Sequence, residues 1–204
     1  NISIVKVNIK GTFRNFKIKR NLESFPENIL ASLAVISNFF DLNNISNKFF
    51  FNYNLPPGRG DYKIIKFNKK KIHLIDESYN SNPLSLDFAL NNFNKLQRNS
   101  KRKIILLGDM LELGKFSKKL HLDAAKIVNK TNINRVYVYG KRITYTYNKI
   151  RPQKRGKILY SSKDVSNFLK NDIKDGEYLM VKGSNSTGLN EMMKKLKLGK
   201  INAI

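Results

Sequence analysis

Hydrophobic and polar residues alternate at the start of this 204-residue chain. Residues 2–9 and residues 13–18 each alternate, with a glycine between the two runs, so we predict a β-hairpin. Pro26 opens an amphipathic stretch whose apolar residues, from Ile29 to Phe40, are spaced for one face of a helix. A second short helix is predicted from Ile45 to Phe51.

Residues 55–61 read Leu-Pro-Pro-Gly-Arg-Gly-Asp and show no apolar period, which is typical of a linker. We therefore place a domain boundary there, with a first domain at residues 1–57 and a second at residues 58–204. In the second domain, short apolar runs alternate with helical patterns, which predicts an α/β fold with a largely parallel sheet and helices on both faces. The strands are predicted at 64–67, 72–75, 104–107, 136–139, 158–160 and 178–181, and the helices at 84–96, 117–128, 165–171 and 189–196.

Composition narrows the class of protein. The 39 Lys and Arg residues against 15 acids leave a net charge of +24, which suits polyanion binding. The cations are spread along the chain, without zinc-finger spacing or an aromatic RNA-binding signature, so we expect no dedicated nucleic-acid function. Cysteine is absent, which excludes disulfides and thiolate chemistry. No apolar run is long enough to span a membrane, and a cytoplasmic protein without membrane insertion is expected.

The most polar of the predicted turns is residues 76–83, which follow the strand at 72–75 and precede a helix. The turn reads Asp-Glu-Ser-Tyr-Asn-Ser-Asn-Pro. Ligands bind outside the carboxyl ends of strands in open α/β sheets, so these acids and amides are candidates for a binding site. The alternative is structural: Asn82 or Ser81 caps the helix and Pro83 occupies its first turn.

Two further strands end in polar turns. Residues 108–114, Gly-Asp-Met-Leu-Glu-Leu-Gly, place two acids between glycines, or alternatively begin a helix whose dipole those acids favour. Residues 182–189, Lys-Gly-Ser-Asn-Ser-Thr-Gly-Leu, offer backbone amides and a lysine to an anion, or alternatively cap a helix through Ser186 or Thr187. The turn at 139–141 is the weakest candidate of this kind.

Together these turns resemble the Mur ligases in order and spacing, over about residues 22–196. Gly58-Arg59 resembles the Gly-Arg at the junction between the family's central and C-terminal domains. The segment Asn28-Ile29-Leu30-Ala31 resembles the helix at the end of the central ATPase domain. The resemblance implies that residues 1–57 are the end of a central domain and that residues 58–204 form a Rossmann-like C-terminal domain.

The resemblance also implies an ATP-dependent, Mg²⁺-using ligase of peptidoglycan synthesis that works as a monomer. ATP would phosphorylate the terminal carboxylate of UDP-N-acetylmuramoyl-tripeptide, and the amine of D-alanyl-D-alanine would attack the acyl phosphate. No catalytic residue is assigned within this chain. The implied nucleotide-binding residues are Asn28 at the adenine, Arg59 at the phosphates, Glu77 at the ribose, and Tyr79. The implied residues of the dipeptide side of the cleft are Asn80, Asn82, Asp109, Glu112, His121, Lys182 and Ser184.

The chain departs from the family pattern in several places. Glu77 occupies a position that is Asp or Glu in the family, Asn185 replaces a usual Arg, and Leu22-Glu23-Ser24 replaces a usual Gly-Arg-His. No Gly-Lys pair is followed by Ser or Thr, so the phosphate-binding P-loop is absent. We expect a C-terminal portion, inactive alone, whose phosphate and Mg²⁺ sites lie in an upstream part. The alternatives are a non-catalytic Mur-type binding module, a sister Mur ligase that adds another amino acid, and a basic nucleic-acid-associated protein.

Overall fold

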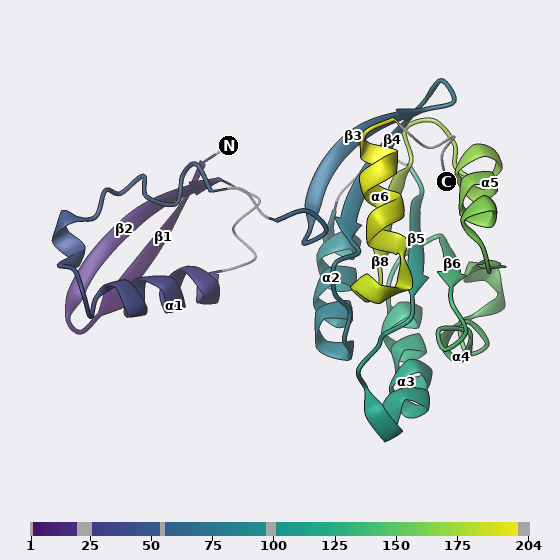
Figure 1. Ribbon diagram of the computed structural model, residues 1–204, viewed down its shortest axis with the longest axis horizontal. Coiled ribbons are helices and arrows are strands. Elements are labelled where there is room, and N and C mark those ends of the chain that lie inside the picture. The colour runs from purple at the N-terminus through teal and green to yellow at the C-terminus, as the bar shows by residue number, and fades with distance from the viewer. Residues whose placement is uncertain (1, 20–25, 54–55, 97–100, 200–204) are drawn as a thin grey trace. The chain divides into compact units, whose positions relative to one another are not determined.

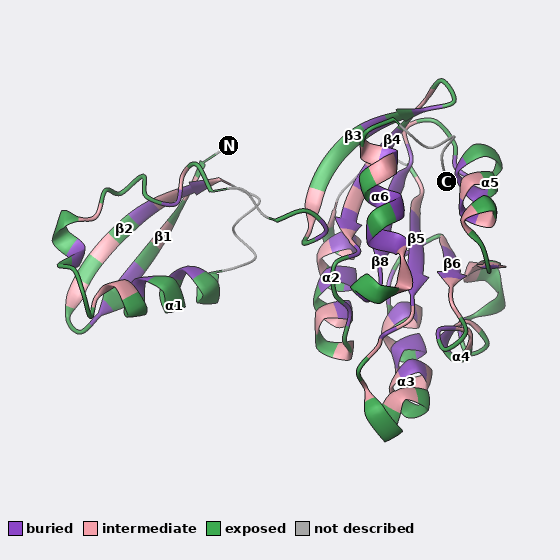
Figure 2. Ribbon diagram, in the orientation of Figure 1, coloured by how far each residue is buried: buried purple, intermediate pink, exposed green. Residues whose placement is uncertain are grey.

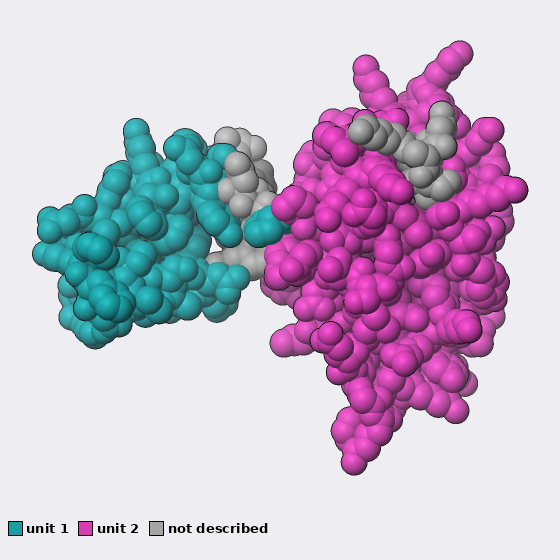
Figure 3. Space-filling model, viewed as in Figure 1, with its two compact units in different colours: residues 1–56 teal, residues 57–204 magenta. Residues whose placement is uncertain are grey.

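The computed structural model describes residues 2–19, 26–53, 56–96 and 101–199. The chain divides into two compact units, Asn1–Pro56 and Pro57–Ile204 (Figure 3). Each unit encloses its own hydrophobic core. Leu55 of the predicted linker and the Leu22-Glu23-Ser24 departure lie outside the described residues.

The first unit contains the β-hairpin that the alternating pattern predicts. β1 (Ile2–Ile9) and β2 (Thr12–Lys19) pair antiparallel along their whole length. Lys10 and Gly11 form the turn with φ of 50° and 83°, a backbone conformation that a glycine adopts without strain. The prediction of a hairpin is confirmed.

One helix covers the buried face of the hairpin. α1 (Pro26–Ile36) begins at the predicted proline and buries Ile29 and Leu33 in the core that it shares with β1 and β2. The helix ends sooner than the apolar pattern suggested. Phe39 and Phe40, predicted on the same face, lie beyond its last residue and are exposed.

The second helix predicted in this unit, from Ile45 to Phe51, is wrong. A 3₁₀ helix, η2 (Leu42–Asn44), forms instead, and successive turns follow it. Asp41 caps η2 by accepting a hydrogen bond from a backbone N–H, and the guanidinium of Arg14 donates to two backbone carbonyls of the segment. Within the segment the N–H of Phe49 donates to the carbonyl of Ser46 and the N–H of Phe51 to that of Lys48, so single turns form in place of a helix.

The second unit alternates strands and helices (Figure 1). All the strands and helices predicted for residues 58–204 are present, and α4 is an addition. The strands are β3 (Asp61–Phe67), β4 (Lys70–Glu77), β5 (Lys103–Gly108), β6 (Arg135–Tyr139), β7 (Arg155–Leu159) and β8 (Tyr178–Lys182). The α-helices are α2 (Pro83–Lys95), α3 (Ser117–Lys130), α4 (Thr144–Tyr147), α5 (Ser162–Asn171) and α6 (Leu189–Lys197). The 3₁₀ helices are η3 (Gly114–Phe116), η4 (Pro152–Lys154) and η5 (Asn185–Thr187).

The strands of this unit form a 6-stranded sheet in the order β3-β4-β8-β5-β6-β7. β3 pairs antiparallel with β4, and the other neighbouring pairs are parallel. β8 is the last strand in the sequence, yet it lies between β4 and β5. The strand order therefore reverses at β8, and such a reversal is where ligands bind in open α/β sheets.

Helices cover both faces of the sheet. On one face α5 and α6 bury apolar residues such as Phe168 and Met193, and on the other α2 and α3 bury residues such as Leu90 and Val128. The central strand β8 is buried at every position (Figure 2). This confirms the predicted α/β fold with a largely parallel sheet.

The backbone of Gly156 on β7 lies against the ring of Tyr137 on β6. A β-carbon at position 156 would lie 2.8 Å from Cζ of Tyr137. That ring is itself buried and packs on Phe168, with ring centroids 4.1 Å apart. We expect Gly156→Ala to lower the free energy of unfolding by about 1–3 kcal/mol, the usual effect of overpacking a core, as measured by urea denaturation.

A Tyr137→Val background provides the matched control. Because the smaller side chain leaves room for the added methyl group, Gly156→Ala should have little further effect there. An equal loss of stability in both backgrounds would contradict the role of the ring.

Candidate functional site

The carboxyl ends of β4, β8 and β5 lie side by side, and a polar turn follows each strand. These turns are residues 78–82, 183–188 and 109–113. In the parallel register Lys182 is paired with Glu77 on one side and with Leu107 on the other. The three turns that the sequence singles out therefore meet where the strand order reverses.

Lys182 ends β8, and its side chain is only 2% exposed. Its Nζ donates to the backbone carbonyl of Asn80 over 2.9 Å and lies 3.7 Å from Oε2 of Glu77. Burial lowers the pKa of Lys182 from its ordinary value, and the Glu77 carboxylate opposes that shift. Because Glu77 ends β4 and Asn80 lies in the turn that follows, Lys182 ties this turn to β8.

Glu77 is the partly exposed member of this ion pair. Burial raises the pKa of Glu77 above its ordinary value, and Lys182 counteracts the rise. Desolvation removes much of the energy of such a pair, so we regard its main effect as orientation rather than stability. It fixes a carboxylate at the end of β4, where that group can accept hydrogen bonds from hydroxyls.

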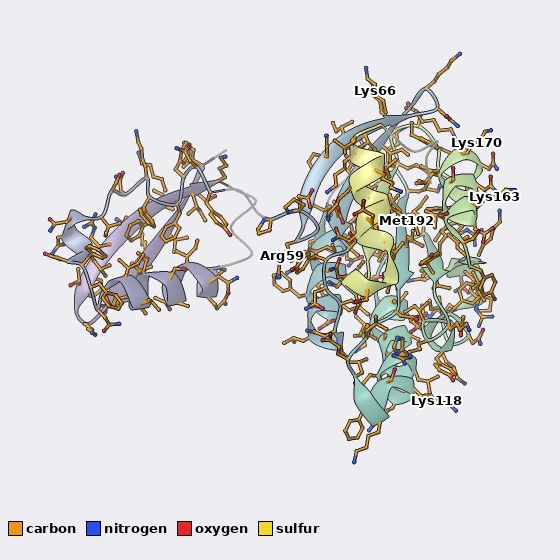
Figure 4. The ribbon with its side chains drawn as sticks, viewed as in Figure 1. Arg59, Lys66, Lys118, Lys163, Lys170 and Met192 are labelled. Atoms are coloured by element: carbon orange, nitrogen blue, oxygen red, sulfur yellow. The ribbon has the colours of Figure 1, made fainter. Side chains whose placement is uncertain are left out.

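Arg59 lies exposed on the segment just before β3 (Figure 4). Its Cζ lies 4.4 Å from the ring centroid of Tyr79. Gly58 and Gly60 flank it with φ of 81° and 87°, which favour glycine. A β-carbon at Gly58 would lie 3.0 Å from Cβ of Tyr79, and one at Gly60 would lie 3.0 Å from Oε1 of Glu77. The two glycines thus let Arg59 approach the end of β4, and Arg59, Glu77 and Tyr79 gather in one small region.

Ser184 connects the three turns. Its backbone N–H donates to the carbonyl of Asp109 over 3.0 Å. Its buried hydroxyl accepts from the N–H of Leu111 over 2.9 Å and donates to the carbonyl of Ser81 over 3.3 Å. The hydroxyl already has partners within the protein, and a substrate contact by Ser184 stays a prediction.

The two acids of the turn after β5 differ in their surroundings. Oδ1 of Asp109 accepts from the N–H of Ile143 over 2.7 Å, and a β-carbon at Gly140 would lie 2.6 Å from the same oxygen. Asp109 therefore holds the turn after β6, and Glu112 is exposed with φ of 62°. The structural alternative does not hold for Asp109, which lies five residues before η3, but it stays a prediction for Glu112, because η3 begins two residues later at Gly114 and runs into α3.

His121 is buried on α3, and both ring nitrogens have protein partners. Nδ1 donates to the carbonyl of Ser117 over 2.7 Å, and Nε2 accepts from the N–H of Met110 over 3.1 Å. Burial lowers the pKa of His121, and the Ser117 carbonyl opposes that effect. The neutral ring thus fixes the turn after β5, and its contact with substrate stays a prediction.

The asparagines of the turn after β4 also differ. Asn82 caps α2: its side chain accepts from the N–H of Ser85 over 2.8 Å in a capping box, and Pro83 follows in the first turn. The structural alternative therefore holds for Asn82. Asn80 has an exposed side chain, and its substrate contact stays a prediction.

Asn28 belongs to the first unit and Asn185 to the second. Asn28 is exposed in the first turn of α1, in the first unit, and its adenine contact stays a prediction. Asn185 begins η5, and its Oδ1 accepts from Nδ2 of Asn190 over 2.8 Å. Asn185 thus uses its side chain within the second unit, where the family pattern has an arginine.

The sequence did not single out an ion cluster beside these turns. Nζ of Lys197 lies 2.7 Å from Oδ2 of Asp61 and 2.6 Å from Oδ2 of Asp76. Both acids belong to segments that the sequence does single out: Asp61 ends the predicted linker, and Asp76 begins the polar turn. The lysine carries no such signal, because it follows the last motif as one of several lysines on a helix.

The part of the chain that the structure describes brings together no group of three or more His, Asp or Glu residues that could hold a metal ion. The two acids at the end of β4, Asp76 and Glu77, pair with Lys197 and Lys182. No helix in the described ranges is both long enough and apolar enough to cross a membrane.

Comparison with known proteins adds the family. Residues 63–185 match the family model described as Mur ligase, glutamate ligase domain. The chain is 34% identical over 128 residues to UDP-N-acetylmuramoyl-tripeptide–D-alanyl-D-alanine ligase of Buchnera aphidicola, which is 60% of this chain and 26% of that protein. It is 27% identical over 128 residues to the ligase of the same name from Bacillus subtilis, which is 61% of this chain and 28% of that protein. The chain therefore spans less than a third of the length of these relatives.

A solved structure agrees in fold. The MurF ligase of Thermotoga maritima, in complex with ADP, superposes with a TM-score of 0.73 at 18% identity, covering 99% of this chain and 44% of that one. At this identity the likeness shows the fold alone. The family match itself covers more than half of the chain and confirms the resemblance carried by the three turns. The chain therefore belongs to the Mur ligase family.

Proposed function

We propose that this chain is the C-terminal part of an ATP-dependent ligase that joins D-alanyl-D-alanine to UDP-N-acetylmuramoyl-tripeptide in peptidoglycan synthesis. The observation that carries the proposal is the meeting of three polar turns at the reversal of strand order, with Arg59 and Glu77 beside them. The names of the curated relatives support this particular member of the family over the other Mur ligases.

Arg59, Glu77 and Tyr79 form the nucleotide side of the proposed site. The guanidinium of Arg59 suits phosphate oxygens, and its position over Tyr79 limits the directions in which it can point. The carboxylate of Glu77, held by Lys182, suits the two hydroxyls of a ribose. Asn28 is proposed to contact the adenine, since an amide can both donate and accept at a purine edge.

The turns after β4 and β5 form the proposed dipeptide side. Asn80 and Glu112 are exposed and can reach a ligand, whereas the side chains of the other predicted residues have partners within the protein. Lys182 and Asn82 shape the turn after β4, and Ser184, with Asp109 and His121, ties the remaining turns together. We therefore propose direct contacts for Asn80 and Glu112 and a positioning role for the others.

The proposed reaction has two steps. The terminal carboxylate of UDP-N-acetylmuramoyl-tripeptide attacks the γ-phosphorus of ATP, and ADP leaves as an acyl phosphate forms. The amine of D-alanyl-D-alanine then attacks the acyl carbon, and phosphate leaves as the amide bond forms. Arg59 would bind the phosphates while negative charge shifts toward ADP. The Mg²⁺ and P-loop contacts are assigned to another part of a longer protein, which we propose works as a cytoplasmic monomer.

Release of ADP by the longer protein tests the proposed activity. With UDP-N-acetylmuramoyl-tripeptide present, we expect ADP release to require D-alanyl-D-alanine, because the amine must consume the acyl phosphate before a second turnover. A coupled assay of ADP with and without the dipeptide measures this. Absence of release from a folded, full-length protein would leave a non-catalytic binding module.

Substitution of Arg59 tests the nucleotide side. We expect Arg59→Gln to weaken ATP binding by at least about tenfold, since a charge-assisted hydrogen bond to phosphate is lost. Tyr79→Ala should weaken it by a smaller factor, since it removes only the ring that orients the guanidinium. Isothermal titration of the longer protein measures both.

Lys66→Gln is the matched control for Arg59→Gln, because Lys66 is an exposed cation on the neighbouring strand β3. It removes one positive charge from the same unit without touching the site. If both variants lost affinity equally, the effect would come from net charge rather than from a contact at Arg59.

A further inference from the structure

An ion cluster beside the proposed nucleotide side joins three elements of the second unit. Lys197, in the last turn of α6, places Nζ between Asp61 at the start of β3 and Asp76 near the end of β4. The Asp76 side chain is fully buried and that of Lys197 is 11% exposed. Burial alone would lower the pKa of Lys197, but the two carboxylates outweigh it and raise the pKa.

Each acid uses its remaining oxygen to hold backbone. Oδ1 of Asp61 accepts from the N–H of Gly58 over 2.6 Å, and Oδ1 of Asp76 accepts from the N–H of Ser78 over 3.0 Å. Asp61 and Asp76 lie directly opposite one another in the β3–β4 register, so their charges would repel without a cation between them. Lys197 thus places a cation between two acids that each hold a neighbouring backbone segment.

The segment that Asp61 holds is the one that carries Arg59. The N–H of Gly60 donates to the carbonyl of Asp76 over 2.8 Å, and the carbonyl of Gly58 accepts from the N–H of Tyr79 over 3.0 Å. Arg59 lies between these two fixed glycines and over the ring of Tyr79. The direction of the Arg59 side chain therefore depends on two contacts: the carboxylate of Asp61 holds Gly58, and the backbone carbonyl of Asp76 holds Gly60.

We propose that Lys197 is a positioning residue, which fixes the Gly58–Gly60 segment through Asp61 and Asp76 and so orients Arg59 toward a nucleoside di- or triphosphate. The functional consequence rests on the proposed nucleotide site. The link from Lys197 to the Gly58–Gly60 segment rests only on the contacts of Asp61 and Asp76, so it can be measured without a ligand.

Lys197→Met tests the link, and Lys194→Met is its matched control. Lys194 is in the same last turn of α6, but its side chain is 50% exposed and pairs with Glu191 of its own helix. Amide hydrogen exchange is read at Gly58 and Gly60, relative to the central β5 residue Leu106. We expect Lys197→Met to speed exchange at both glycines by about tenfold or more, with a smaller change at Leu106, because the segment opens locally. The control should match the wild type.

Asp61→Ala provides a second test should Lys197→Met fail to fold. It removes the acceptor of the Gly58 N–H but leaves Lys197 paired with Asp76, so exchange at Gly58 should again rise. Unchanged exchange at Gly58 in a folded form of either variant would overturn the proposal.

ADP binding by the longer protein tests the consequence for Arg59. We expect Lys197→Met to weaken ADP binding about 3- to 10-fold and Lys197→Arg, which keeps the charge, to restore most of the affinity. If Lys197→Met sped exchange at Gly58 and Gly60 but left ADP affinity unchanged, the cluster would not orient Arg59. That result would overturn the proposed effect on nucleotide binding. If the wild type itself bound no ADP, the proposed function would fail, while the exchange rates would still decide the link.

Discussion

The insertion of β8 between β4 and β5 is the constraint on which the rest of the second unit depends. β8 pairs in parallel with both neighbours and is buried at every position. Only with β8 in place do the turns after β4 and β5 come within reach of one another through Ser184. The site therefore requires the last strand of the sheet in sequence order, and its contacts are non-local, so closing the intervening loops costs entropy and slows folding.

The same placement explains the buried charges. β4 ends in two consecutive acids, whose side chains point to opposite faces of the sheet. Glu77 meets Lys182 of β8, and Asp76 meets Lys197 of α6. A buried carboxylate without a partner would be strongly destabilising, so each acid requires its own lysine. In a chain of net charge +24 these two lysine side chains are at most 11% exposed.

The spacing of apolar residues predicted most strands and helices, because an element that buries one face repeats its apolar residues with the period of a helix or a strand. It failed at Ile45–Phe51, where the carbonyls of Ile45 and Asn47 accept hydrogen bonds from Arg14 and Lys17 of β2. The position of β8 was beyond local pattern, since periodicity identifies a strand and not its neighbours. The turns were found by their polar residues. The division between Asn80, which is exposed, and Ser184, which has partners within the protein, depends on tertiary contacts that a motif does not contain.

Both lysines that neutralise the end of β4 come from the last strand and helix of the described chain. Each also has a consequence beyond its ion pair: Lys182 holds the carbonyl of Asn80, and Lys197 supports the acid that holds Gly58. The turn after β4 and the segment carrying Arg59 are thus both anchored from the C-terminal end. A substitution in α6 that spares every proposed ligand contact can therefore still alter the geometry of Arg59 and Glu77 together.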